Sequence, residues 1–211
     1  QFVTTHPKTF AFYMTQATGR TFRGIRFRGC EFRGPSGTFI VMGGSTSPTY
    51  NATHSLRWEG EITGCRFLFD KSQMPVSTDV NLIIANAWSS FTFADNYIEA
   101  TGNFPVSVGS AYSRLGLFNN SLLTRVMRNS ANWSGTGSFG VGATGFIVDI
   151  SLADVAGTTR GLYVQDNVLY STAGTGWSYG IAVTTGATFP ANRSFSCNGN
   201  FANFANTATN N

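Results

Sequence analysis

The 211 residues are 42% hydrophobic, 14% aromatic and 11% charged, against about 25% charged residues in an average soluble domain. The aromatic content excludes a disordered chain, and the composition excludes a coiled coil. The longest apolar runs fall short of the roughly 18 residues of a membrane span, and no signal peptide is recognised, so we expect no membrane insertion. The net charge of +4 is mild, so nucleic acid is not an expected partner. The length fits one domain over residues 1–211, and a start at Gln1 rather than Met indicates processing, trimming or a fragment.

Short apolar runs with a period of two recur along the whole chain and predict strands with one buried face. Each run precedes one copy of a second recurring pattern, the template described below, so it is expected to be the first strand of a repeat. In chain order these runs are Phe10–Met14, Phe39–Met42, Leu82–Ala85, Pro105–Val108, Phe146–Ile150 and Ile181–Thr184.

The template reads apolar, x, apolar, x, x, Asn or Cys, x, apolar, and successive copies start 35, 31, 24, 47 and 33 residues apart. Pairs such as Gly29-Cys30 and Asn119-Asn120 suit a tight bend, because Gly and Asn tolerate the left-handed conformation. Each copy therefore predicts a short strand, a bend and another short strand. The six copies are Ile25-Phe27-Cys30-Phe32, Gly60-Ile62-Cys65-Phe67, Phe91-Phe93-Asn96-Ile98, Leu115-Leu117-Asn120-Leu122, Leu162-Val164-Asn167-Leu169 and Phe195-Cys197-Asn200-Ala202.

Six repeats of three strands each predict an all-β, three-sided parallel β-solenoid. Each repeat would form one turn, or rung, so the solenoid would have about six rungs. The copies at Gly24–Gly34 and Gly161–Tyr170 resemble rungs of the right-handed parallel β-helix in pectate-lyase-like proteins, and bacteriophage tailspikes are similar. The resemblance extends from about Phe10 to Phe204 and implies a right-handed, single-stranded parallel β-helix. It is more specific for the fold than for the function, because one fold hosts many activities.

Residues at equivalent positions in neighbouring rungs should lie about 4.8 Å apart. This spacing predicts amide stacking of Asn120 near Asn96 and of Asn200 near Asn167. It also predicts the outer-face ion pairs Arg26–Glu61 and Glu31–Arg66.

Cys30 and Cys65 share one corner and fall within disulfide range. A free thiol in place of Asn is the favoured interpretation, and Cys197 is expected to be a small core residue. The three cysteines lack CxxC spacing, which argues against a zinc site or a disulfide framework. We therefore predict neither a metal nor a cofactor.

The outward positions on the last strand of each repeat are unexpectedly apolar for a face in contact with water. Apolar patches of this size usually contact a partner, so we predict a homo-oligomer interface, and the tailspike resemblance implies a homotrimer. Loops that fold back over this face are the alternative. The predicted interface residues are Leu68, Tyr97, Leu123, Val168, Tyr170 and Phe201.

Aromatic residues in the predicted connections are candidates for sugar binding, because the apolar faces of sugars stack on flat rings. The alternative is that each ring packs within its own loop. These candidates are Tyr50, Trp58, Trp88, Tyr112, Trp133 and Trp177.

Glycoside hydrolysis needs two carboxylates, and the best candidate pair is Asp149 and Asp154. Glu31, Glu61 and Glu99 are interpreted as structural. The signature motifs of polygalacturonases and pectate lyases are absent from the sequence.

The favoured hypothesis is a tailspike-type receptor-binding module that recognises a bacterial surface polysaccharide, on a virion or outside the cell. A polysaccharide depolymerase, acting as a hydrolase or lyase, is the first alternative. A purely structural fibre protein is the second.

Overall fold

The computed structural model describes residues 1–5, 11–15, 23–35, 38–44, 59–70, 72, 80–86, 88–102, 113–119, 123–134, 143–149, 161–171, 177–184 and 194–202. This part of the chain is all-β and contains no α-helix. Its strands form three sheets in which every pair of neighbours runs parallel.

The first sheet contains β2 (Phe12–Thr15), β5 (Ile40–Gly44), β8 (Val80–Asn86), β11 (Ser113–Asn119), β14 (Ala143–Asp149) and β17 (Trp177–Thr184). The second contains β3 (Ile25–Arg28), β6 (Gly60–Thr63), β9 (Phe91–Ala94), β12 (Leu123–Met127), β15 (Gly161–Gln165) and β18 (Ser194–Asn198). The third contains β1 (Phe2–Val3), β4 (Glu31–Gly34), β7 (Arg66–Asp70), β10 (Tyr97–Thr101), β13 (Ser130–Trp133), β16 (Val168–Ser171) and β19 (Phe201–Ala202).

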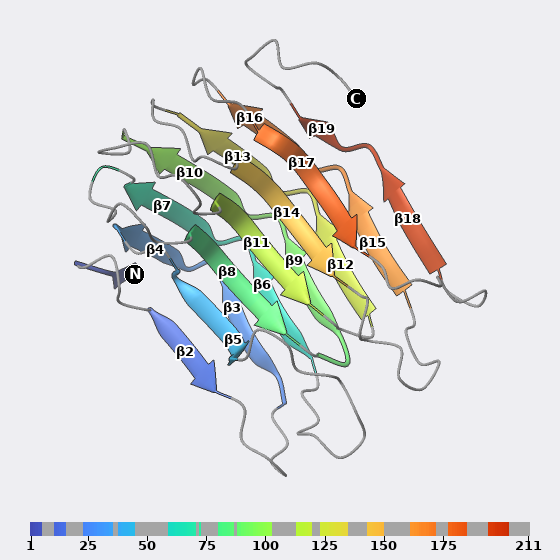
Figure 1. The fold of residues 1–211 in the computed structure, drawn as a ribbon. Coiled ribbons are helices and arrows are strands. Elements are labelled where there is room, and N and C mark those ends of the chain that lie inside the picture. The colour runs from blue at the N-terminus through green and yellow to red at the C-terminus, as the bar shows by residue number, and fades with distance from the viewer. Residues whose placement is uncertain are drawn as a thin grey trace.

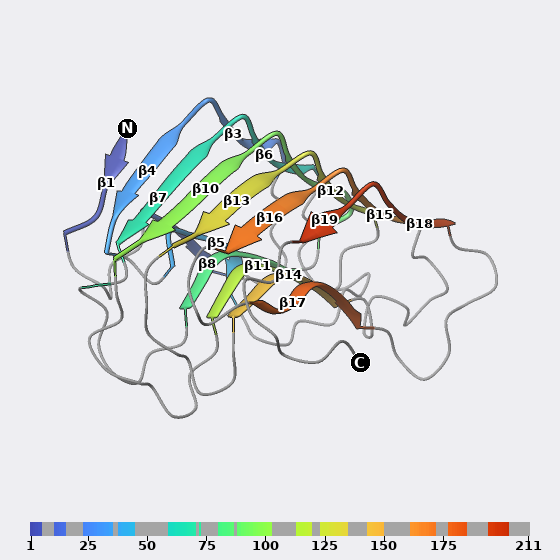
Figure 2. The same cartoon turned by 90° about the horizontal axis from the view of Figure 1, so that it is seen from above.

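The chain visits the three sheets in a fixed order, and each pass adds one strand to each sheet (Figure 1). Figure 2 shows the third sheet joined to the second along a row of corners, with the first sheet on the other side of the core. The arrangement is consistent with the predicted β-solenoid. We call each set of three consecutive strands a rung, with β2, β3 and β4 forming rung one.

The sequence-based assignment of the fourth rung was wrong. Leu115 and Leu117 lie in β11, which pairs with β8 and β14 in the first sheet. The fourth copy of the template instead begins at Thr124, which pairs with Phe91 and Leu162. The flanking intervals are therefore 33 and 38 residues (91 to 124 and 124 to 162), and the repeat is more regular than expected. The strand predicted at Pro105–Val108 lies outside the described residues.

The corner between the second and third sheets uses one left-handed residue in every rung. Three rungs place Gly there, two place Asp, and the fourth places Arg128 with φ of 52°. A positive φ is uncommon for Arg, and Arg128 is held by Asp95 one rung earlier, with Nε–Oδ1 and Nη2–Oδ2 distances of 2.7 and 2.8 Å. The six corner residues are Gly29, Gly64, Asp95, Arg128, Asp166 and Gly199.

A ladder of side-chain amides follows this corner. Asn96 donates from Nδ2 to Oδ1 of Asn129 at 3.0 Å, and Asn129 donates to Asn167 at 2.9 Å. Asn167 donates to Asn200 at 2.8 Å, which confirms the predicted Asn167–Asn200 stack. The predicted stack of Asn120 on Asn96 was wrong, because Asn129 occupies that position.

Side chains from all three sheets pack into one hydrophobic core. Phe32 and Phe67 stack in the third sheet with ring centroids 4.9 Å apart and an interplanar angle of 6°. Phe93 of the second sheet lies 5.3 Å from Phe118 and 5.6 Å from Phe146 of the first. This aromatic packing connects the sheets across the interior.

Charged side chains on the outer faces connect rungs one and two. The predicted pairs are confirmed at 3.5 Å for Arg26–Glu61 and 3.5 Å for Arg66–Glu31. Arg28 makes the closer contact with Glu61, donating from Nη2 at 2.7 Å and from Nε at 2.9 Å. The hydrogen bond from Arg28 is the main cause of the lowered pKa of Glu61.

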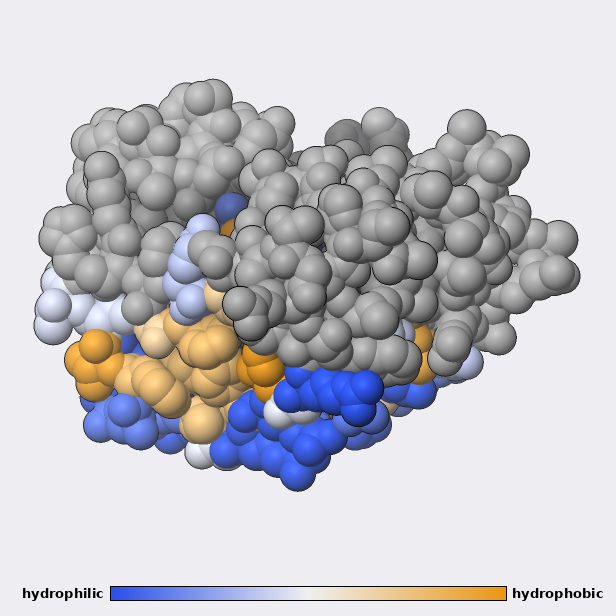
Figure 3. Space-filling view, turned by 90° about the horizontal axis from the view of Figure 1, so that it is seen from below, coloured by the Kyte–Doolittle hydropathy of each residue, from blue (hydrophilic) through white to orange (hydrophobic). Residues whose placement is uncertain are grey.

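The N-terminal end of the stack combines hydrophobic and charged surface. Among the described residues, β2 and β3 have no strand on their outer side. Val3 and Tyr13 are 60% and 52% exposed. Figure 3, which views the molecule from the side where β2 lies in Figure 1, shows a hydrophobic area next to a strongly hydrophilic one.

Candidate functional site

Two rows of outward-facing side chains cross the third sheet, perpendicular to its strands. The strand registers define both rows. We call them the Glu31 row, made of Glu31, Arg66, Tyr97, Ser130, Val168 and Phe201, and the Arg33 row, made of Arg33, Leu68, Glu99, Asn132 and Tyr170.

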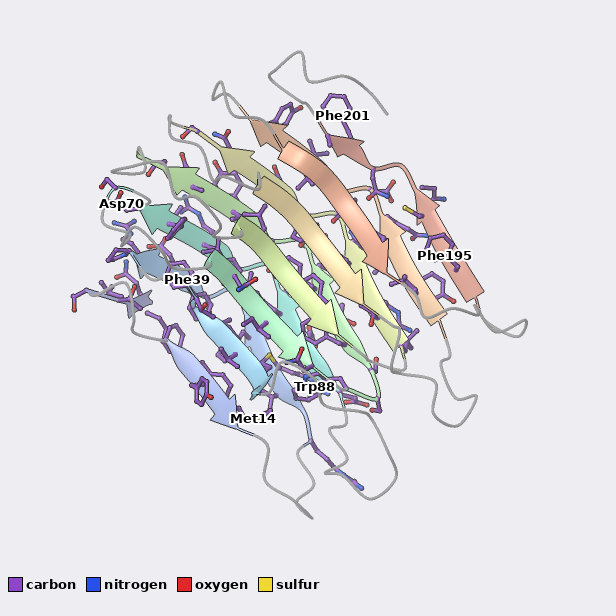
Figure 4. All side chains as sticks on the ribbon, viewed as in Figure 1. Met14, Phe39, Asp70, Trp88, Phe195 and Phe201 are labelled. Carbon is purple, nitrogen blue, oxygen red and sulfur yellow. The ribbon has the colours of Figure 1, made fainter. Side chains whose placement is uncertain are left out.

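A pocket of about 360 Å³ opens on this face where β4, β7 and β10 end. Leu68 pairs with Arg33 on one side and with Glu99 on the other. Asp70 pairs with Thr101 two residues further along, and Figure 4 shows Asp70 at the end of β7. The lining residues include Arg33, Pro35, Leu68, Asp70, Glu99 and Thr101.

The Asp70 carboxylate is held in a local turn. Its Oδ1 accepts hydrogen bonds from the backbone N–H of Ser72 at 2.9 Å and from the Ser72 hydroxyl at 2.6 Å. Gly102 lies beside it with φ of 77°, and a Cβ at that position would come within 2.8 Å of Asp70 Oδ1. Gly102 leaves room for the Asp70 carboxylate, and the hydrogen bonds from Ser72 hold it at the rim of the pocket.

Arg33 and Glu99 give the pocket a mixed electrostatic character. Arg33 pairs with Glu31 in its own strand at 3.1 Å. Arg66 lies over the ring of Tyr97, with its guanidinium carbon 5.9 Å from the centroid. Burial, and then the neighbouring Glu99 carboxylate, raise the pKa of Tyr97. The pocket thus offers hydrogen-bond donors and acceptors around the apolar side chain of Leu68.

Sequence reasoning missed this pocket. It interpreted Glu99 as structural, predicted Leu68 as an interface residue, and named neither Arg33 nor Asp70 as a site residue. The available signal was the spacing of the template itself, which places Arg33, Leu68 and Glu99 at the same position of consecutive rungs.

The predicted interface residues do not all lie on one face. Leu123 belongs to β12 in the second sheet, where it pairs with Gly161, so its assignment to the third sheet was wrong. The fourth rung contributes Ser130 and Asn132 there instead. Because both are polar, the fourth rung separates the apolar positions of this face into two groups, Leu68 and Tyr97 before it and Val168, Tyr170 and Phe201 after it.

Tyr170 and Phe201 are the exposed aromatic residues that these rungs place on the third sheet, at 44% and 52%. Their ring centroids lie 5.8 Å apart, and Val168 precedes Phe201 in the Glu31 row. Leu68 and Tyr97 are half-buried in the middle of the same face. Figure 4 shows Phe201 and Phe195 at the C-terminal end of the stack.

The predicted sugar-binding aromatics do not form a common platform among the described residues. Trp88 is fully buried and donates from Nε1 to the Met42 carbonyl oxygen at 3.3 Å, so it is a core residue. Trp133 ends β13 in the third sheet, and Trp177 begins β17 in the first, so both lie in strands rather than in connections. Tyr50, Trp58 and Tyr112 lie outside the described residues.

The proposed catalytic pair is only partly described. Asp149 is the last residue of β14, where it pairs with Asn119 and Thr184. Asp154 lies outside the described residues.

All three cysteines are described, and all three thiols are free. Cys197 is exposed, so the expectation that it is a core residue was wrong. In the ranges the structure covers, no three His, Cys, Asp or Glu side chains converge to hold a metal ion. No helix in those ranges has the length and apolarity needed to cross a membrane.

Comparisons with known proteins add no relative: no family model, no curated protein and no solved structure matches the chain.

Proposed function

We propose that this protein is a glycan-binding module built on a right-handed parallel β-helix of the pectate-lyase and tailspike type. The observation that carries the proposal is the pocket on the outer face of the third sheet. It combines the carboxylates of Asp70 and Glu99 with the guanidinium of Arg33 around Leu68. Binding sites for small molecules typically combine apolar surface with a few placed polar groups, and a sugar ring presents hydroxyls beside an apolar face.

The right-handed coil is supported by a general rule. Connections between parallel strands of one sheet are right-handed in about 98% of cases, and every described strand pair here is parallel with a long connection between its members.

The biological setting of the proposal is a bacteriophage tailspike or tail fibre that contacts a bacterial surface polysaccharide. The low charged fraction and the repeating rungs favour this class. It would act on a virion or outside the cell, without insertion into a membrane.

We propose that the module works as a homotrimer, with Val168, Tyr170 and Phe201 in the contact between copies. At one end of the third sheet, Tyr170 and Phe201 are exposed with their rings in contact, and the half-buried Val168 pairs with Phe201. The Tyr170→Arg variant should dissociate the oligomer without unfolding the chain, as measured by size-exclusion chromatography with light scattering. Tyr13→Arg is the matched control, because Tyr13 is a similarly exposed tyrosine on a different sheet. A Tyr170→Arg protein of unchanged size, or a monomeric wild type, would refute the interface.

A panel of purified bacterial surface polysaccharides tests the binding site. The wild type should bind at least one glycan, and Glu99→Gln or Leu68→Arg should weaken that binding by tenfold or more, which corresponds to about 1.4 kcal/mol. Glu59→Gln is the control, because Glu59 is an exposed carboxylate paired with Arg26 in another part of the surface. Equal binding by wild type and Glu99→Gln would exclude the pocket, and a wild type that binds no glycan would exclude the function.

A depolymerase is the second candidate, because the pocket is lined by two carboxylates, Asp70 and Glu99. The two residues are one strand and two positions apart, so their Cα atoms lie about 8 Å apart from the usual strand dimensions. Inverting glycosidases hold their two carboxyl groups about 6.5–9.5 Å apart, a separation that two acidic side chains on Cα atoms about 8 Å apart can adopt. Shortening of a bound glycan by the wild type, abolished in both Asp70→Asn and Glu99→Gln, would establish this activity.

A further inference from the structure

Cys30 and Cys65 occupy, in the first two rungs, the corner position that holds Asn in the next four. At that position the side chains of consecutive rungs touch. The amide-to-amide distances are 3.0 Å for Asn96–Asn129, 2.9 Å for Asn129–Asn167 and 2.8 Å for Asn167–Asn200. A pair of cysteines in the same column is therefore also placed for side-chain contact.

The backbone around both cysteines follows the same register as the ladder. The N–H of Arg66 donates to the Cys30 carbonyl oxygen at 2.8 Å, and the N–H of Gly29 donates to the Thr63 carbonyl oxygen at 3.0 Å. The corners of rungs one and two are thus stacked directly. Neighbouring strands lie about 4.8 Å apart, and disulfides span Cα separations of about 4.4–6.8 Å. The pair meets this requirement.

The two thiols also adopt the same conformation. Cys65 Sγ lies 3.4 Å from the Thr63 carbonyl oxygen, and Cys30 Sγ lies 3.5 Å from the Arg28 carbonyl oxygen, in each case two residues earlier in the chain. Cys65 Sγ also donates to the Phe27 carbonyl oxygen of the preceding rung at 3.5 Å. Equivalent contacts in consecutive rungs place the two sulfur atoms on the same side of the corner.

We propose that Cys30 and Cys65 form an oxidisable dithiol, a modification site at which a low-molecular-weight disulfide such as oxidised glutathione produces a covalent bond between rungs one and two.

The surroundings of the two thiols set the order of the chemical steps. Cys30 is half-buried, whereas Cys65 is 1% exposed. Burial raises the pKa of the Cys65 thiol to about 11, so Cys65 stays protonated while Cys30 reacts first. The Cys30 thiolate attacks one sulfur of oxidised glutathione and releases one glutathione thiolate.

The second step closes the bond within the protein. Cys65 loses its proton and attacks the Cys30 sulfur of the mixed disulfide, which releases the second glutathione. The two cysteines together lose two electrons and two protons. The oxidised glutathione takes up these electrons and protons and becomes two molecules of reduced glutathione.

The bond would stabilise the end of the stack. Rung one contains β2 and β3, whose outer edges carry no described strand, so it has fewer backbone contacts than an internal rung. A covalent link at the corner attaches this rung to rung two and also restricts the unfolded chain over residues 30–65. The oxidised protein should therefore unfold at a higher temperature than the reduced protein.

The test uses the reduced protein and the Cys197→Ser variant, which removes the exposed thiol of the last rung and leaves the pair intact. Each protein is incubated with oxidised glutathione, and its free thiols and peptide map are determined by mass spectrometry. In Cys197→Ser both thiols should disappear, with a mass lower by two hydrogen atoms and one linked pair of peptides. Dithiothreitol should restore both thiols and lower the melting temperature again.

Several outcomes would overturn the proposal. These are a glutathione adduct that persists on Cys30, two thiols that remain free, or a covalent dimer in place of an internal bond. The Cys30→Ser variant serves as a further control, since its Cys65 should remain a free thiol. If that variant does not fold, the peptide map of the wild type decides the question alone.

Discussion

Replacing Asn129 tests whether the buried amide ladder stabilises the stack. Asn129 is 1% exposed, and its Oδ1 accepts from the backbone N–H of Asn96 at 3.0 Å. Its Nδ2 donates to the Phe93 carbonyl oxygen at 3.0 Å and to Asn167 Oδ1 at 2.9 Å. Asn129→Ala removes all of these interactions, and the Asn96 N–H loses its acceptor in a buried position.

The expected loss follows from these contacts. A buried N–H without an acceptor costs about 1–3 kcal/mol, and each further hydrogen bond lost contributes about 0.5–1.5 kcal/mol. We expect Asn129→Ala to lower the free energy of unfolding by about 3 kcal/mol, a large part of the roughly 5–15 kcal/mol typical of a native protein.

Urea unfolding followed by tryptophan fluorescence measures this loss, and two variants provide controls. Asn200→Ala removes the last amide of the ladder, which is partly accessible to water, so water can replace Asn200 Oδ1 as the acceptor of the Asn167 N–H. Its cost should therefore be about 1 kcal/mol. Asn129→Cys should recover part of the loss, because the native Cys65 thiol donates to the Phe27 carbonyl oxygen in the equivalent place. A cost below about 1 kcal/mol for Asn129→Ala, or equal costs for Asn129→Ala and Asn200→Ala, would refute the reasoning.

Two further predictions concern packing and charge. Gly60→Ala should lower the free energy of unfolding by about 1–3 kcal/mol through overpacking, because its Cβ would lie 2.8 Å from the Trp88 ring and 2.9 Å from the Phe91 ring; urea unfolding showing an unchanged midpoint would contradict this. Arg28 lowers the pKa of Glu61, so this pair contributes stability above the ordinary pKa of a glutamate and loses it as the pH falls through the lowered value. Glu61→Gln should therefore flatten the acid side of the curve of melting temperature against pH, and an identical curve for the variant would exclude the ion pair as a stabilising contact.

The amino-acid sequence determined the strands and their buried faces, because a period of two separates inward from outward side chains without any knowledge of neighbours. It also determined the corners that use Gly or Asp followed by Asn or Cys, since few residues accept the left-handed conformation. The ion pairs Arg26–Glu61 and Glu31–Arg66 between rungs one and two could also be predicted from the sequence, because residues at equivalent positions of adjacent copies stack.

The fourth rung depended on tertiary structure. Its corner residue, Arg128, has no local preference for a positive φ, and the reason for its conformation is Asp95, 33 positions away in the chain. A local search for turn residues therefore selected Asn119-Asn120, which fits the template by spacing alone. For the same reason Leu123 was assigned to the third sheet, although it lies in the second.

The pocket likewise could be found only from the tertiary structure. Arg33, Leu68 and Glu99 belong to three different rungs, and none of them has a sequence neighbour that marks it as part of a site. The stacking of parallel strands in register brings the three side chains into adjacent positions on one face. Local patterns thus determined which residues face inward, while the register between distant copies determined which outward residues meet.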